Sequence, residues 1–168
     1  MSKTATYALI ASATISGTST STHTFSNIPG TYTDLMIVAS GTGTTDIDIS
    51  CRFNGDSGGN YSRTMLYGTG SAAGSARSTN LAFVRLNYSA YWTASNTSVS
   101  VGHIMDYSNS TTFKTVLTRS NNASLAVDAQ VNLWRNTAAI TSIEIYTSAF
   151  AFGNGSTFKL YGIQAGNA

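Results

Sequence analysis

Near its C-terminus the chain reads Gly155-Ser156-Thr157-Phe158-Lys159-Leu160-Tyr161-Gly162-Ile163. Apolar and polar side chains alternate through this stretch up to Leu160-Tyr161, which is the period-two pattern of a strand with one buried face. Such a strand has to pair with other strands in a sheet. The stretch therefore predicts a self-contained β domain in which it is the last strand. The stretch carries no group for catalysis, and it favours an assembly role over an enzymatic one.

The composition favours an all-β fold. The chain has 168 residues, of which 42% are hydrophobic and only 10% are charged, whereas about 25% is usual for charged residues. Ser and Thr supply roughly three residues in ten, and Glu144 is the only glutamate. Helix formers other than alanine are therefore scarce, whereas Thr, Val, Ile, Tyr and Phe suit pleated, half-buried surfaces. The length and even composition predict a single domain over residues 1–168.

The alternation of the terminal stretch recurs along the chain. It is clearest in Asp46–Asn54, where Ile47, Ile49, Cys51 and Phe53 share one face. The other expected strands are Tyr7–Ser16, Thr22–Phe25, Leu35–Ala39, Tyr61–Tyr67, Leu81–Tyr88, Val99–Tyr107, Phe113–Arg119, Leu125–Arg135 and Ile140–Tyr146. Short strands separated by turn residues predict a single antiparallel, jelly-roll-like β-sandwich of about ten strands.

Two expectations within that pattern concern particular segments. The apolar run Leu35–Ala39 predicts a central strand that is buried on both faces. Gly68–Ser78 consists largely of Gly, Ala and Ser, and it predicts a loop that is mobile or docked on a partner.

Charge and hydropathy argue against several classes of function. The net charge is +2 with the basic residues scattered, so we expect no nucleic-acid partner. No apolar run approaches the roughly 20 residues of a membrane helix, so we expect no membrane partner. The start, Met1-Ser2-Lys3, leads into Thr-rich sequence rather than an apolar signal region, which predicts synthesis in a cytosol. Cys51 is single, so it predicts a small buried strand residue and no internal disulfide.

No catalytic, metal or cofactor site is expected. The only histidines, His23 and His103, have no ligand at zinc spacing, and no nucleophile elbow is present. Asp46 and Asp48 share one strand face, where a solvated surface is the simpler interpretation than a catalytic pair. Asn54–Asn60 is rich in oxygen ligands but lacks calcium-loop spacing, so it is interpreted as a turn, with a weak ion site as the alternative.

The best candidates for a binding patch are the aromatic residues Tyr88, Tyr91 and Trp92. Exposed Tyr and Trp side chains anchor protein interfaces and stack on sugars. The alternative is that they plug one end of the sandwich. For Trp134, which lies on an alternating strand, a place in the core is favoured.

Several segments resemble, in one order along the chain, a β-sandwich domain found in structural proteins of tailed bacteriophages. The matching pieces are Ile28–Leu35, Phe53–Asp56, Asn60–Ser62, Leu133–Ile143 and Leu160–Ile163. The resemblance implies a jelly-roll-like sandwich in a virion surface protein, often a homotrimer, with no catalytic motif. Pro29, Gly30, Asn54 and Gly55 match as turn residues, and the apolar matches are core residues.

Two functions follow from this resemblance. The first is a capsid decoration, or cement, protein that is made in the host cytoplasm, binds the major capsid protein or another virion protein, and bridges capsomers. In this case Met1–Thr6 and Gly68–Ser78 are expected to dock on neighbours. The second is a tail-fibre or receptor-binding tip that recognises a host glycan, for which Tyr88, Tyr91 and Trp92 would be the contact residues.

Overall fold

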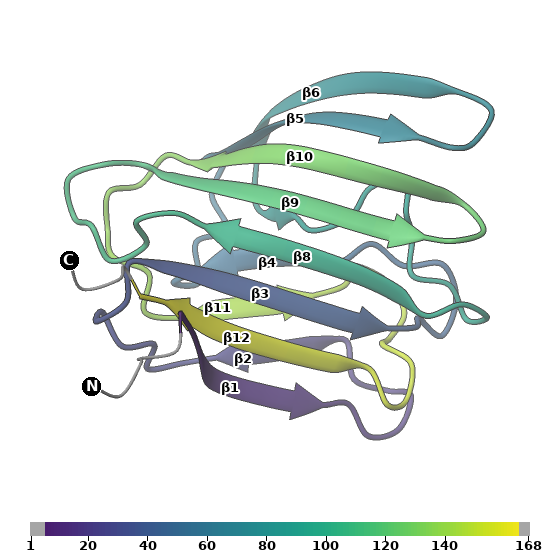
Figure 1. Ribbon diagram of the computed structural model, residues 1–168, viewed down its shortest axis with the longest axis horizontal. Helices are drawn as coiled ribbons and strands as arrows, with labels where there is room; N and C mark the ends of the chain where they lie inside the picture. The colour runs from purple at the N-terminus through teal and green to yellow at the C-terminus, as the bar shows by residue number, and fades with distance from the viewer. Residues whose placement is uncertain (1–5, 165–168) are drawn as a thin grey trace.

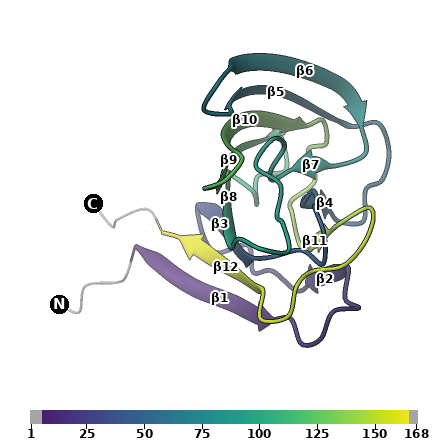
Figure 2. The same cartoon turned by 90° about the vertical axis from the view of Figure 1, so that its right-hand side faces the viewer.

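The computed structural model describes residues 6–164, which form two antiparallel sheets packed face to face (Figures 1 and 2). The larger sheet contains, in spatial order, β1 (Tyr7–Thr14), β12 (Thr157–Ile163), β3 (Asp34–Gly41), β8 (Ser98–Ile104), β9 (Lys114–Asn122), β10 (Ala126–Trp134), β5 (Tyr61–Gly68) and β6 (Ala73–Leu81). The smaller sheet contains β2 (Thr22–Phe25), β11 (Ile143–Tyr146), β4 (Ser50–Phe53) and β7 (Val84–Arg85). The expected all-β antiparallel sandwich is confirmed.

The chain crosses repeatedly between the two sheets. Only β5–β6, β8–β9 and β9–β10 are hairpins between neighbours in sequence, and the remaining pairs join strands that are far apart in the chain. The terminal strand β12 lies between β1 and β3, where Phe158 and Leu160 face inward and are fully buried. The alternation that predicted this strand therefore marks its buried face correctly.

Two aromatic clusters anchor the core between the sheets. In one, Trp92 stacks on Phe158 with ring centroids 6.1 Å apart. In the other, Trp134 stacks on Tyr61 at 6.2 Å and meets Phe53 edge-on at 5.4 Å. All five side chains are fully buried, and each contributes about 1.5–3 kcal/mol of hydrophobic stabilisation. The core position expected for Trp134 is confirmed.

The structure corrects several sequence-based boundaries. It has twelve strands rather than about ten, partly because Gly68–Ser78 is not a loop. The second half of that segment pairs with β5 as β6, and a tight turn closed by the Thr69 N–H and the Ala72 carbonyl joins the two strands. The regular strand within Asp46–Asn54 is only β4, although Ile47 makes an isolated bridge to Trp92.

The larger sheet is covered on one side only. The prediction that Leu35–Ala39 is buried on both faces is wrong, because Leu35, Ile37 and Ala39 are fully buried while Met36 and Val38 are only partly so. In Figure 1 the larger sheet faces the viewer and the smaller sheet lies behind it, so no other strand of residues 6–164 covers the near side. This open side positions the candidate site.

Candidate interaction surface

Strand β10 points its polar residues into the protein and its apolar residues outward. Asp128, Gln130 and Asn132 are each at most 5% exposed. The reason lies at the end of the strand, where the Trp134 ring is fixed in the core against Tyr61. Since side chains alternate with period two, every second residue before Trp134 must face the same way. The position of Trp134 therefore determines which side chains of β10 face the protein interior, and these are the polar ones.

Hydrogen bonds satisfy much of this polar interior. The Asp128 carboxylate accepts from the N–H groups of Tyr88 and Ala90 at 2.8 and 3.2 Å, and from the Gln130 amide at 3.2 Å. Arg63 donates to the Gln130 side-chain oxygen at 3.4 Å. Buried polar groups are tolerated where they are paired in this way. The inward polar face of β10 thus holds the segment around Tyr88 against the sheet.

A second charged pair lies beside this network. The Arg85 guanidinium contacts the Asp48 carboxylate. Burial raises the pKa of Asp48, although Arg85 opposes that rise. Burial also lowers the pKa of Arg63, and the nearby charge of Arg85 lowers it further. With two arginines and two aspartates, Asp48 and Asp128, the charges of the cluster sum to zero.

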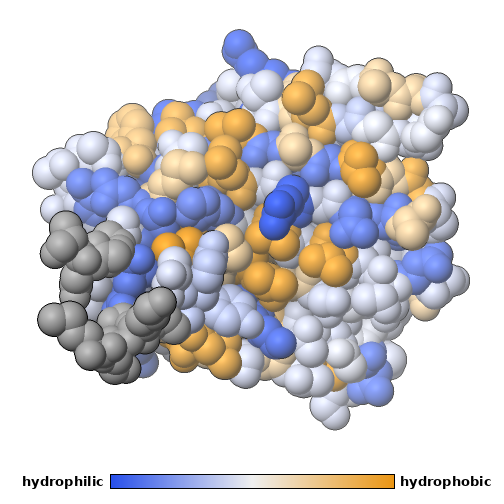
Figure 3. Space-filling model, in the orientation of Figure 1, coloured by the Kyte–Doolittle hydropathy of each residue, from blue (hydrophilic) through white to orange (hydrophobic). Residues whose placement is uncertain are grey.

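The outer face of the larger sheet, by contrast, is open to solvent and carries many apolar side chains among polar ones (Figure 3). Leu66, Val127 and Val131 are 64, 59 and 51% exposed. The strand registers bring further side chains onto the same face, namely Leu9, Met36, Val38, Val99, Val101, Leu117, Ala129, Leu133 and Tyr161. We call this set the outer apolar face. Exposed apolar clusters with polar residues around them mark interaction sites, so the face is a candidate interaction surface.

The charges on this face are almost all positive. The exposed side chains of Arg77, Arg119 and Lys159 lie on it, and none of them forms an ion pair with another residue between 6 and 164. Asp34 is the one carboxylate on the face among those residues, and it is bonded to His103 at 2.8 Å. The other carboxylates of the described chain lie inside or on other surfaces.

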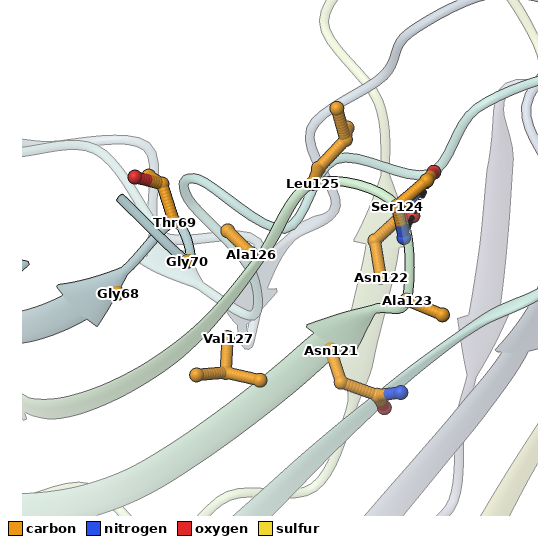
Figure 4. Close-up of a pocket in the computed structure, with 10 residues that line it drawn as sticks. All are labelled: Gly68, Thr69, Gly70, Asn121, Asn122, Ala123, Ser124, Leu125, Ala126 and Val127. Atoms are coloured by element: carbon orange, nitrogen blue, oxygen red, sulfur yellow. Dashed lines mark hydrogen bonds between the residues drawn. The ribbon is translucent and has the colours of Figure 1, made fainter. Parts of the chain in front are cut away.

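Shallow hollows interrupt the outer apolar face. One of about 410 Å³ is lined by Thr64, Arg77, Val131 and Leu133, and another of about 260 Å³ by Met36, Val101, His103, Leu117 and Arg119. A third, of about 300 Å³, lies at the edge of the face. Figure 4 shows it between the end of β5, with Thr69 on one side, and the β9–β10 turn on the other. The face therefore has recesses into which side chains of a partner protein can insert.

The aromatic residues expected to form a binding patch do not lie together on the surface. Trp92 is fully buried, its indole N–H donates to the Ser100 hydroxyl at 3.2 Å, and it belongs to the core, as the plug alternative predicted. Tyr91 is 38% exposed. Tyr88 is half-buried, with the Arg63 guanidinium 4.8 Å from its ring centroid. Of the three, Tyr91 is the most exposed, and the three side chains form no common surface platform.

The Asn54–Asn60 segment is a turn whose carboxylate is already engaged. Asp56 accepts from the Trp134 indole N–H at 2.7 Å, from the Asn60 amide at 2.9 Å and from the Gly58 N–H at 2.9 Å. Burial raises the pKa of Asp56, but these three hydrogen bonds outweigh that effect and the pKa is lowered. The turn serves to fix Trp134 and the start of β5.

The residues considered as candidates for catalysis or metal binding do not lie together. His23 packs edge-on to Phe25, whereas His103 lies on the outer face. Cys51 is buried, as expected, and burial raises the pKa of its thiol. Asp46 is exposed while Asp48 turns toward Arg85. Between residues 6 and 164, no three His, Cys, Asp or Glu side chains are grouped so as to hold a metal ion.

Two further expectations concern docking by the N-terminal segment and the absence of a membrane-spanning helix. Most of Met1–Thr6, the N-terminal segment expected to dock on neighbours, lies outside the described residues. The part of the chain that the structure describes forms no helix long and apolar enough to span a membrane.

Sequence reasoning missed the outer apolar face, although one signal was present. In β10, Trp134 lies an even number of residues from Asp128, Gln130 and Asn132, so it shares a strand face with them and not with the valines. A core tryptophan in that phase forces the valines outward.

A scan against models of known protein families finds no match, and a search of curated proteins finds no similar sequence.

Proposed function

We propose that the protein is a bacteriophage virion structural protein, and specifically a capsid decoration protein that attaches to the assembled shell and bridges capsomers. The observation that carries the proposal is the outer apolar face. It is a broad surface of the eight-stranded sheet with exposed apolar side chains, among them Leu66, Val127 and Val131. Such a surface suits protein association. The sequence resemblance to tailed-phage sandwich domains supplies the virion context.

The proposed mechanism is stabilisation by mass action. A protein that binds only the assembled shell stabilises it by RT ln(1 + [L]/Kd), so each bound copy adds to the free energy of disassembly. Many copies with modest interfaces would together resist internal pressure. A homotrimer, synthesised in the host cytoplasm, would present several outer faces at once and gain from multivalency.

The receptor-binding alternative has less support. It relied on Tyr88, Tyr91 and Trp92 as a platform for a host glycan, and Trp92 is buried in the core. Stacking on sugars requires exposed aromatic rings. Tyr91 alone provides a smaller platform than the three residues together, so we favour the decoration function.

The test is the stability of particles with and without the protein. Particles produced without it should release DNA at a lower temperature than complete particles, and adding the purified protein back should restore the difference. Particles that bind no added protein, or that lose DNA at the same temperature in both forms, would refute the decoration function. A location at the tail tip in labelled particles would favour the alternative.

A further inference from the structure

We propose that the outer apolar face docks a second virion protein whose surface carries an apolar strip flanked by carboxylates. This inference rests on the proposed function and adds the partner's chemistry. It is carried by the arrangement of charge on the face, by the size of the face, and by its hollows.

The three cations divide the face at regular intervals. Arg77 lies on β6, Arg119 on β9 and Lys159 on β12, so each is three strands from the next. With strands about 4.8 Å apart, neighbouring cations are separated by about 14 Å across the sheet. Two apolar panels lie between them. Val131 and Leu133 belong to the first panel, and Val38 and Val101 belong to the second.

Each panel coincides with one of the hollows. The hollow of about 410 Å³ lies in the first panel and has Arg77 on its border. The hollow of about 260 Å³ lies in the second panel and has Arg119 on its border. Each hollow therefore combines apolar side chains with polar ones and has a guanidinium at its edge. This is the arrangement of an interface with an apolar centre and a charged rim.

The size of the face fits a specific protein partner. Eight strands about 4.8 Å apart and about eight residues long at about 3.3 Å each give roughly 1,000 Å². A standard interface takes about 800 Å² from each partner, so one partner can be accommodated on this face alone. The valines and leucines of this surface are also the residue types with which sheets pack in β-sandwiches.

Charge argues against a second copy of this chain as the occupant. In a face-to-face pair, Arg77, Arg119 and Lys159 of both copies would meet almost no carboxylate, because Asp34 is already bonded to His103. Like charges across an interface oppose association. A polyanion is also disfavoured, because cations about 14 Å apart with valines and leucines between them form no continuous basic stripe.

The test compares binding of four purified proteins to particles produced without this protein. The unaltered protein and Phe150→Asn should bind equally, because Phe150 is 66% exposed but lies outside the strands of the sheet. Its backbone φ of 65° also suits asparagine. Val131→Asp and Arg119→Glu should each bind at least fivefold more weakly, with unchanged thermal unfolding temperatures.

A zero-length carbodiimide cross-link on complete particles identifies the partner's chemistry. This reagent joins amines to carboxylates, and Lys159 is the one exposed lysine among residues 6–164. The expected product links Lys159 to an Asp or Glu of a different virion protein. A link from Lys159 to a second copy of this chain would overturn the proposal.

The remaining outcomes separate the two proposals. Equal particle binding by all four proteins would overturn the docking face and leave the decoration function standing. Failure of the unaltered protein to bind any particle would refute the decoration function, and this partner with it. Binding to vesicles of phosphatidylglycerol and phosphatidylcholine that both face variants abolish would replace the protein partner with a lipid surface.

Discussion

The contact between Asp56 and Trp134 is a single hydrogen bond whose removal has a calculable effect. The Trp134 indole N–H donates to the Asp56 carboxylate at 2.7 Å, and the Trp134 side chain is fully buried. Asp56→Ala removes the acceptor and leaves a buried donor unpaired, which costs about 1–3 kcal/mol. The lost bonds from Asn60 and Gly58 add little because both residues reach solvent. We expect a total loss of about 2–3 kcal/mol, or about 5–9 °C in Tm for a chain of this length.

The assay is urea unfolding followed by circular dichroism, extended to a double-mutant cycle with Trp134→Phe. In the phenylalanine background no donor remains, so Asp56→Ala should cost less than about 1 kcal/mol. The control is Asp46→Ala, an exposed carboxylate on another segment, which should change stability by less than about 0.5 kcal/mol. An Asp56→Ala loss no larger than that of the control, or equal losses in both backgrounds, would refute the reasoning.

The same contact predicts how acid affects the protein. The folded-state pKa of Asp56 lies below its usual value of 3.8, because its hydrogen bonds outweigh the effect of burial. The carboxylate therefore contributes stability that is fully present above the unfolded-state pKa and is lost as pH falls through the folded-state pKa. Asp56→Ala should remove this part of the acid dependence, which urea midpoints between pH 5 and pH 2.5 would measure.

Three other predictions concern a strand, a histidine and an exposed ring. Gly162→Ala places a methyl group about 2.3 Å from the Tyr32 ring and should lower stability by about 1–3 kcal/mol in urea unfolding, whereas an unchanged midpoint would contradict the packing. Burial lowers the pKa of His23 below 6.5, so stability should decrease as pH falls from 7.5 to 5.5, and His23→Asn should lose that dependence. Tyr91→Ala should leave particle binding within twofold, whereas a loss above tenfold would place Tyr91 in the attachment surface and contradict attachment through the outer apolar face alone.

The strands that could be predicted from the sequence are those in which alternation coincides with apolar burial. Thr22–Phe25 matches β2 at both ends, and the terminal strand matches because Phe158 and Leu160 fill the core. Gly68–Ser78 could not be predicted as a hairpin, because Gly, Ala and Ser carry little strand preference. Its strand forms through pairing with β5, which is a tertiary effect.

The candidate site was harder to predict because alternation does not indicate which face points inward. On β10 the apolar side chains Val127 and Val131 are exposed, and the polar Gln130 is buried. Only the contacts of Trp134 with residues distant in sequence determine that phase. Trp92 shows the same limit, since it packs on Phe158 and forms a bridge with Ile47, and both residues are distant in sequence.

The central claim is that the protein attaches to its particle through the outer face of the eight-stranded sheet. The most direct test is a cryo-electron microscopy reconstruction of the complete particle at a resolution that shows side chains. We predict density on the capsid exterior, with Val131 buried against a neighbouring protein and carboxylates of that neighbour beside Arg119 and Lys159. A reconstruction in which this face lies open to solvent while another surface makes the contact would contradict the claim.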